Sequence, residues 1–298
     1  MSEHASWDLA EGEPIAPGRV ALKSLGGGNR YEVFLVWDEN LYSLAVAKLL
    51  RPDQAEDPKA LRDLAKEAEA LGALAHPVLI RSFDAVLDGD RPHVLIEHLE
   101  GPSLRRLIKR GGPLPLEQTL PVALHVAGAL QYMANTGFVH LDVKPDNIVM
   151  GVPPRLIDLS IARRVEDAVK SRGPIGTDAY MAPEQCGDGS DVAAMGPASD
   201  AWGLGATIYH AVSGQKPFGS TDDADREAGG ERRFPQLISA PAPLPEHLPQ
   251  SLRELIAALL EKDPHARPTC GEAVERLEPL IAELPRKMVL GRRGAQGV

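Results

Sequence analysis

The sequence has little cysteine, no long apolar run and no excess of positive charge. Only two cysteines, Cys186 and Cys270, occur in 298 residues, and neither lies in the spacing of a metal site or a redox motif. No uninterrupted apolar run approaches the roughly 18 residues that a membrane-spanning helix needs. The acidic N-terminus also lacks the basic and apolar regions of a signal peptide. We therefore expect a reducing compartment, no membrane span and a cytoplasmic location.

The charge and composition narrow the class of protein further. A formal net charge of -10 argues against a general nucleic-acid or membrane-surface binder, because polyanions would be repelled. With 43% hydrophobic and 25% charged residues, the chain resembles neither a disordered nor a fibrous protein. Its length suits one large domain or two lobes that share a cleft.

The pattern of apolar residues changes along the chain. Apolar segments at 20–25, 33–37 and 44–50, separated by turn residues, predict a small antiparallel sheet. Residues 58–75 have helical periodicity, residues 93–99 predict another strand, and long helical patterns follow at 116–136, 200–213 and 251–260. We expect an α+β fold of two lobes, with an N-terminal extension (1–18), a sheet-rich lobe with one helix (19–99), a larger α-rich lobe (100–284) and a flexible basic tail (285–298).

The strongest chemical signal is the sequence His-Leu-Asp-Val-Lys-Pro-Asp-Asn at residues 140–147. Asp142 and Asn147 lie five residues apart in a polar loop, where a carboxylate can orient a hydroxyl while an amide ligates a metal. Asp158 follows eleven residues later, at the end of an apolar segment. Oxygen ligands of this kind suit Mg²⁺, which completes its shell with water and phosphate. This is the outline of an ATP site.

Here the sequence resembles the eukaryotic-like serine/threonine protein kinase family, over roughly residues 20–280. The resemblance implies that Asp142 is the catalytic base and that Lys144 steadies the γ-phosphate. It also implies that Asn147 and Asp158 hold Mg²⁺, for which Mn²⁺ is a possible substitute. The expected reaction transfers a phosphoryl group from ATP to serine or threonine hydroxyls of protein substrates.

The first part of the chain agrees with this resemblance. A glycine cluster lets backbone N–H groups approach phosphate oxygens, although alone it also fits a plain hairpin turn. The residues that resemble the nucleotide site are Gly26, Gly27, Gly28, Val33, Val46, Lys48, the gatekeeper position Ile96 and the hinge from Glu97 to Leu99. Hinge bonds to adenine use the backbone, so the side chains there are poorly informative.

One carboxylate in the predicted helix at 58–75 needs a cation. At 100° per residue, Glu67 falls within the apolar stripe and Glu69 points away. A buried carboxylate is costly unless it is paired, so we predict an ion pair between Lys48 and Glu67. The alternative is that Glu67 lies at the rim of the stripe in water.

Downstream, residues 176–184 resemble the substrate-docking loop of the family. Thr177 would contact Asp142 and Lys144, an arrangement of serine/threonine rather than tyrosine kinases. By the same resemblance, Glu184 and Arg267 form a buried structural ion pair, and Asp200 anchors the 140–147 loop.

Several positions depart from the family's pattern. Tyr31 replaces the third glycine and Val46 replaces an alanine above adenine, and both changes are expected to lower nucleotide affinity. Leu159 and Ser160 stand where the family has phenylalanine and glycine after Asp158. Leu141 replaces the arginine that pairs with a phosphorylated residue in many members, so we predict that catalysis does not require phosphorylation of residues 158–184.

Two other functions compete with a protein kinase. A pseudokinase would keep the fold and bind partners with little turnover, and a small-molecule phosphotransferase would use a related Asp and Asn. The intact phosphate, metal and base residues argue against the first alternative, and the 176–184 loop argues against the second. The sequence leaves the physiological substrate and the oligomeric state open.

Overall fold

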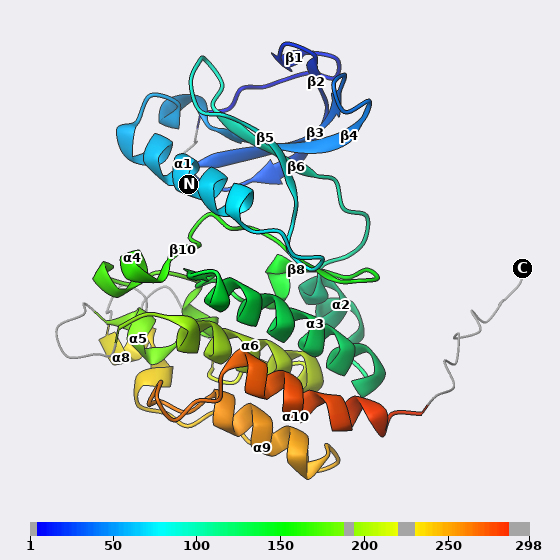
Figure 1. Ribbon diagram of the computed structural model, residues 1–298, viewed down its shortest axis with the longest axis vertical. Coiled ribbons are helices and arrows are strands. Elements are labelled where there is room, and N and C mark those ends of the chain that lie inside the picture. Colours follow the sequence, from blue (N-terminus) through cyan, green and yellow to red (C-terminus); the bar gives the residue numbers. More distant parts are fainter. Residues whose placement is uncertain (1–4, 188–193, 220–229, 286–298) are drawn as a thin grey trace, which may run out of the picture.

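The computed structural model describes residues 5–187, 194–219 and 230–285 of the chain. Figure 1 shows two unequal parts, a curled sheet with one long helix above and a larger set of helices below. The predicted α+β fold with two lobes is therefore confirmed. Apart from Pro285, the predicted basic tail lies outside the described residues.

The upper lobe is built on a six-stranded sheet in which every neighbouring pair of strands is antiparallel, in the order β1-β2-β3-β4-β6-β5. Its strands are β1 (Pro14–Ala16), β2 (Arg19–Gly27), β3 (Tyr31–Asp38), β4 (Ser43–Leu50), β5 (Ser82–Val86) and β6 (His93–Glu97). Burial alternates along β3, as expected for a strand that is covered on one face. The sequence did not predict β5, nor β1, whose residues fall within the predicted N-terminal extension.

The helix of the upper lobe, α1 (Pro58–Ala73), begins at an N-cap and buries one face. The Asp57 side chain accepts a hydrogen bond from the N–H of Ala60, which satisfies one of the free donors of the first turn. The helix ends two residues before the predicted limit of 75. Its buried face includes Leu64, Leu71 and the carboxylate of Glu67, so the predicted helical phase is confirmed.

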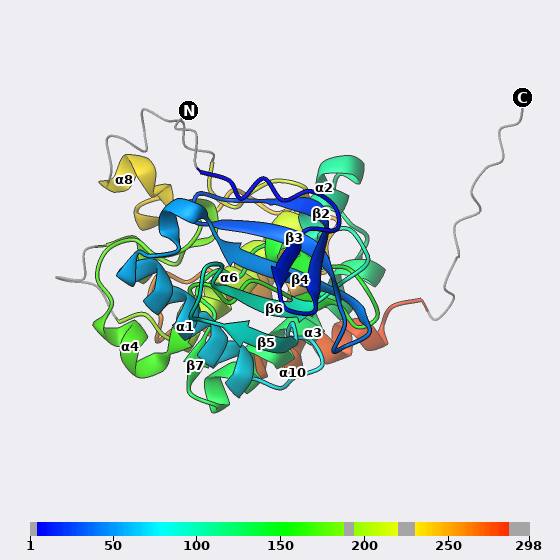
Figure 2. The same cartoon turned by 90° about the horizontal axis from the view of Figure 1, so that it is seen from above.

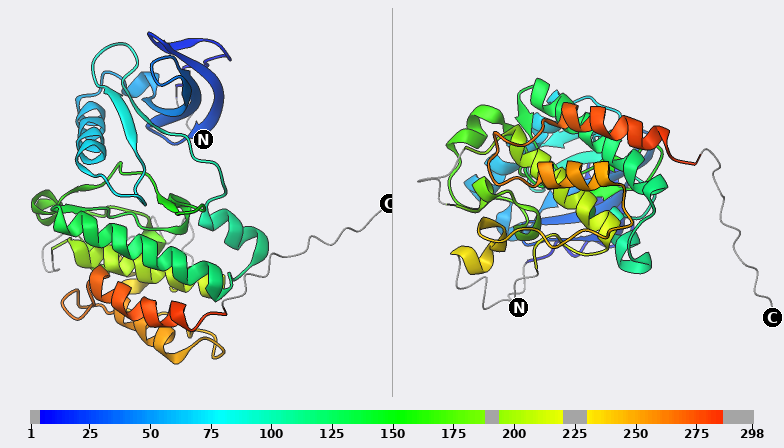
Figure 3. Two further views of the ribbon diagram at one scale, coloured as in Figure 1. Left: turned by 45° about the vertical axis from the view of Figure 1, so that its right-hand side comes forward. Right: turned by 90° about the horizontal axis from the view of Figure 1, so that it is seen from below.

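The lower lobe is mainly helical. Its helices are α2 (Leu104–Gly111), α3 (Leu116–Asn135), α4 (Val165–Lys170), α5 (Pro183–Cys186), α6 (Pro197–Ser213), α8 (Gly230–Arg233), α9 (Gln250–Leu259) and α10 (Cys270–Ala282). Helix α6 is buried on nearly every side, and α3, α9 and α10 pack around it (Figure 3). The three predicted long helices are present as α3, α6 and α9, whereas α2 and α10 were not predicted.

Four short strands form two antiparallel pairs near the boundary between the lobes. Strand β7 (Phe138–Val139) pairs with β10 (Arg163–Arg164), and β8 (Ile148–Val149) pairs with β9 (Arg155–Leu156). The polar segment 140–147 connects β7 to β8 and includes the 3-10 turn η2 (Pro145–Asn147). The predicted chemical residues of this segment therefore lie where the two lobes meet.

One apolar core continues from α1 through the lobe boundary into α3 and α6. A second, smaller core lies on the outer face of the sheet and includes Phe34, Val36 and Leu49. Within the described residues, no helix has the length and apolarity that crossing a membrane requires.

Candidate active site

The 140–147 loop is fixed to the buried helix α6 through its backbone. The Asp200 carboxylate accepts hydrogen bonds from the N–H groups of His140, at 2.8 Å, and Leu141, at 2.7 Å. Burial raises the pKa of Asp200, although these N–H groups and the nearby His140 favour its charged form. The predicted anchoring contact is therefore present.

Leu141 has an unusual backbone conformation, with φ of 64°. A non-glycine residue in this region costs on the order of 1 to 3 kcal/mol, so the surrounding structure must hold it there. The Leu141 side chain is buried with Val139, Ala168 and Met195, and Gln185 Nε2 donates a hydrogen bond to its carbonyl at 2.8 Å. Apolar packing thus supports the strained position.

The side chain of Asp142 lies at the centre of a polar cluster. Lys144 Nζ donates to Asp142 Oδ2 at 2.6 Å, and the Thr177 hydroxyl donates to Asp142 Oδ1 at 2.7 Å. Lys144 Nζ also donates to the Thr177 hydroxyl at 2.6 Å, which closes a triangle. Asn147 Nδ2 donates to the carbonyl of Asp142 at 2.9 Å and to Oδ2 at 3.0 Å. Four residues that the sequence placed in one site are therefore in contact.

A second polar cluster surrounds the ammonium group of Lys48, on β4. Lys48 Nζ donates to the two carboxylate oxygens of Glu67, at 2.8 and 3.0 Å, and to Asp158 Oδ1 at 2.9 Å. The predicted ion pair with Glu67 is thus present. Glu69 instead pairs with Arg164 near the surface.

Burial and charge act in opposite directions on these groups. Burial disfavours the charged form of Lys48, but Glu67 and Asp158 outweigh it and raise the pKa of Lys48. Burial alone would raise the pKa of Asp158, yet Lys48 holds it well below its usual range. Burial raises the pKa of Glu67, with Lys48 acting against that shift. Lys48 and Asp158 are therefore charged at neutral pH.

Asn147 and Asp158 present oxygen atoms suited to a hard cation. Because Asn147 uses its amide nitrogen to donate to Asp142, its carbonyl oxygen remains available, and it accepts no hydrogen bond among the described residues. Asp158 has one oxygen that is not engaged by Lys48, and its backbone φ is 64°. A carboxylate and an amide oxygen fit Mg²⁺ that arrives with phosphate ligands of its own.

A cleft of about 560 Å³ lies beside these clusters, between the lobes. Its wall is largely apolar, and the apolar residues include Leu25, Val33, Val46, Ile96, Leu99, Val149 and Ile157. Volume and lining are typical of a small-molecule site. Gly27 and Gly28 line the cleft, whereas Gly26 does not. A Cβ atom on Gly27 would lie 2.3 Å from the Tyr31 carbonyl, so this position requires glycine.

The hinge offers its backbone to the cleft. The carboxylate of Glu97 accepts hydrogen bonds from Arg81 and forms an ion pair with Arg155, so its charge is engaged in protein contacts. The backbone N–H of Leu99 has no hydrogen-bond acceptor in the part of the chain that the structure describes. It is therefore available to a ligand.

Tyr31 makes a contact that the sequence did not predict. The ammonium of Lys48 lies 4.5 Å from the centre of the Tyr31 ring, a distance typical of a cation–π contact. Burial and the charge of Glu67 raise the pKa of the Tyr31 hydroxyl to about 12, so the ring stays neutral. The position was recognisable from the sequence as a replaced glycine, but the direction of the ring was not.

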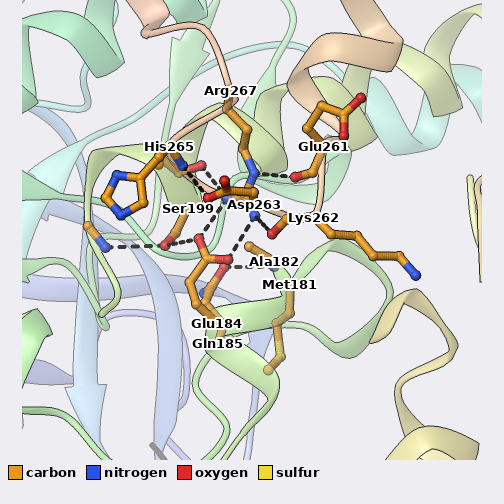
Figure 4. A network of polar contacts seen from close by, with 12 residues as sticks. Met181, Ala182, Glu184, Gln185, Ser199, Glu261, Lys262, Asp263, His265 and Arg267 are labelled. Atoms are coloured by element: carbon orange, nitrogen blue, oxygen red, sulfur yellow. Dashed lines mark hydrogen bonds and ion pairs between the residues drawn. The ribbon is translucent and has the colours of Figure 1, made fainter. Parts of the chain in front are cut away.

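The predicted structural ion pair lies behind the docking loop. Glu184 and Arg267 form a bidentate contact at 2.7 and 2.9 Å, and Ser199 donates a hydrogen bond to the same carboxylate (Figure 4). This network connects α5 to α6 and to the segment before α10. It thereby supports the loop that carries Thr177.

Comparison with known proteins identifies the family. The protein kinase domain matches residues 20–277. The probable serine/threonine-protein kinase PkwA of Thermomonospora curvata is 34% identical over 272 residues, which cover 89% of this chain and 35% of that protein. The serine/threonine-protein kinase PknB of Mycobacterium leprae is 32% identical over 204 residues, covering 65% of this chain and 32% of that protein.

A third relative also matches most of this chain but only part of its own length. The probable serine/threonine-protein kinase CPE1738 of Clostridium perfringens is 27% identical over 266 residues, which cover 87% of this chain and 38% of that protein. The chain thus spans about a third of the length of the curated relatives it matches. Since the domain match covers most of the chain, the chain belongs to the protein kinase domain family.

Proposed function

We propose that the chain transfers the γ-phosphate of ATP to serine or threonine hydroxyls of protein substrates. The observation that carries this proposal is the triangle of Asp142, Lys144 and Thr177, beside a cleft whose inner wall holds Lys48, Glu67 and Asp158. The first cluster would face the acceptor hydroxyl, and the second would face the phosphates of ATP. The names of the relatives support the same reaction.

The cleft has an apolar part that suits adenine and a charged part that suits phosphates. Adenine would lie between Val33 and Val46 above and Val149 and Ile157 below, with the Leu99 backbone N–H as a donor. Lys48 would bind the α- and β-phosphates, and Glu67 holds it in that position. Asn147 and Asp158 would hold Mg²⁺, or Mn²⁺ in its place, and the metal would neutralise charge on the phosphates.

Asp142 would orient the acceptor hydroxyl and take its proton. An ionised carboxylate only accepts hydrogen bonds, so the donors Lys144, Thr177 and Asn147 fix its direction before a substrate arrives. Lys144 also supplies a positive charge beside the point where the phosphoryl group would transfer. Thr177 links the docking loop to this carboxylate, which supports serine and threonine as acceptors.

We also propose that residues 158–184 need no phosphorylation to become ordered. Leu141 and Leu159 are 3% and 1% exposed, so apolar packing occupies the position of a charge switch. The hydroxyl of Ser171 donates to the carbonyl of Asp167 and accepts from Arg163, both at 2.8 Å. The segment is therefore held by contacts of the unmodified side chain.

The test is phosphosite mapping after the purified protein is incubated with ATP and Mg²⁺ and a generic acceptor protein. Modified serines or threonines are expected with the wild type and are expected to be lost with Asp142→Asn. The contact between Tyr31 and Lys48 favours one competing function, a pseudokinase that holds nucleotide weakly. ATP binding without phosphate transfer at saturating ATP would establish that alternative and refute the proposed reaction.

A further inference from the structure

We propose that residues 5–13 form a strap that positions the glycine loop, residues 26–31, over the cleft, with Trp7, Glu32 and Arg51 as the positioning residues. The inference rests on the proposed function, because it assigns the loop to nucleotide binding. The strap lies within the predicted N-terminal extension (1–18).

The strap contacts the outer face of the sheet at Trp7 and the backbone of β2 at Gly12 and Glu13. Trp7 packs against the second apolar core, and its indole N–H donates to the carbonyl of Leu50 at 2.7 Å. The guanidinium carbon of Arg91 lies 5.1 Å from the centre of the Trp7 ring. Farther along, Gly12 N–H donates to Ala21 O, and Ala21 N–H donates to Glu13 O, both at 2.8 Å. Figure 2 shows this segment running beside β2 and β3.

The first link from the strap to the loop is the carboxylate of Glu32. Glu32 follows the loop directly, pairs with Gly27 across the hairpin and is 7% exposed. Ser6 Oγ donates to one of its oxygens at 2.7 Å, and Trp7 N–H donates to the other at 2.9 Å. A buried carboxylate is costly without such donors, so the strap stabilises this position of the hairpin.

The second link is the guanidinium of Arg51, which bridges the loop and the strap. Arg51 Nε donates to the carbonyl of Gly28 at 2.7 Å, and its Nη1 donates to the carbonyl of Ala5 at 2.9 Å. The backbone N–H of Arg51 donates to Arg30 O at 2.9 Å. Arg51 also lies 3.5 Å from Glu32, so both links belong to one cluster.

The consequence concerns the cost of ordering the loop. Three consecutive glycines give the loop an unusually large conformational freedom in the absence of ligand. Contacts that restrict the loop before ATP binds reduce the entropy lost on binding, which raises affinity without a new contact to the ligand. A strap that merely covers the edge of the sheet would stabilise the fold but would leave nucleotide affinity unchanged.

The experiment compares Trp7→Ala and Arg51→Gln with Trp37→Ala in the full chain. Trp37 lies on the same sheet, at the end of β3 away from the glycine loop, and packs on Tyr42. It therefore controls for loss of stability in the upper lobe. Trp7→Phe keeps an aromatic ring but loses the donor to Leu50. The measurements are KM and kcat with a generic acceptor protein, ATP affinity by calorimetry, the unfolding midpoint and amide hydrogen exchange of residues 26–31 without ATP.

We expect Trp7→Ala and Arg51→Gln to raise KM and the dissociation constant for ATP by roughly tenfold, with kcat changed less than about twofold. Hydrogen exchange of the loop should accelerate in both variants, and Trp7→Phe should fall between wild type and Trp7→Ala. Equal effects in Trp37→Ala, or unchanged loop exchange in the strap variants, would overturn the proposal. The exchange measurement needs no catalysis. If the strap variants show faster loop exchange but the wild type transfers no phosphate, the proposed function is refuted and the strap proposal stands.

Discussion

Replacing Glu184 with glutamine is expected to destabilise the protein strongly, although the residue lies outside the cleft. Arg267 uses every N–H of its guanidinium in this network. Two contacts reach the Glu184 carboxylate, and the others reach the carbonyls of Ala198, Lys262 and Glu261 at 2.9, 3.0 and 2.6 Å. Glutamine keeps the size of the side chain but removes the charge that compensates the buried cation.

The size of this destabilisation follows from the burial of the Glu184–Arg267 ion pair. The side chains of Arg267 and Glu184 are 0% and 1% exposed, so water does not screen the unpaired charge. Breaking a buried ion pair by removing one partner costs about 3 to 5 kcal/mol. A domain of this size loses about 2 to 4 °C of its unfolding midpoint per kcal/mol, so we expect a decrease of about 10 °C.

The assay is thermal and urea unfolding of matched variants. The control is Asp63→Asn, which breaks the ion pair with Arg30, whose side chains are 44% (Arg30) and 29% (Asp63) exposed. A pair of that kind contributes about 1 kcal/mol or less. The double variant Glu184→Gln with Arg267→Met should be more stable than the sum of the two single losses, because no charge remains buried. A loss in Glu184→Gln no larger than that in Asp63→Asn would refute the reasoning.

Four further predictions concern Lys48, Glu67, His210 and Ser171. Lys48→Met should nearly abolish phosphate transfer while the circular dichroism spectrum is unchanged, because Lys48 positions phosphates, and retained turnover would contradict its role. Glu67→Gln should lower kcat/KM by about tenfold or more, equivalent to about 1.4 kcal/mol, whereas Glu69→Gln should be silent in the same kinetic assay. Burial and nearby cations lower the pKa of His210 from 6.5 to about 4. Stability from neutral His210 is therefore present above pH 6.5 and lost as the pH falls towards 4, so acidification from pH 7 to 5 should cost wild type about 2 kcal/mol more than His210→Gln in urea unfolding. Phosphatase treatment or Ser171→Ala should leave the initial rate within about twofold of wild type, and a tenfold loss would show a phosphate switch.

Periodicity predicted helix α1 and the phase of its buried face. The phase of α1 distinguished Glu67 from Glu69, because a helix of 3.6 residues per turn separates neighbouring positions by 100°. The site motifs were predictable since short sequences set the local spacing of Asp142 and Asn147. Their roles as base and metal ligand stay predictions that the Asp142→Asn experiment tests.

Other elements were missed for separate reasons. Helix α10 has both a capping box, in which Thr269 and Glu272 bond to each other's backbone N–H groups, and an apolar stripe that includes Leu277 and Leu280, so the sequence contained enough signal to predict it. Strand β1 has three residues and gains its place by pairing with β2, so no local pattern could identify it. The links from Ser6 and Trp7 to Glu32 join residues 25 or more positions apart, which spacing along the chain cannot reveal.

The structure changes the interpretation of Tyr31, which departs from the family's pattern. From the sequence, a tyrosine in place of the third glycine predicts lower nucleotide affinity. In the structure its ring lies against the same ammonium that Glu67 and Asp158 hold. Lys48 therefore has an aromatic partner as well as two carboxylates. A phosphate that binds Lys48 must share the ammonium with Asp158 and the Tyr31 ring, or displace one of them. Tyr31 lines the cleft and also contacts the Lys48 ammonium, so its effect on nucleotide binding and its effect on turnover need not have the same sign.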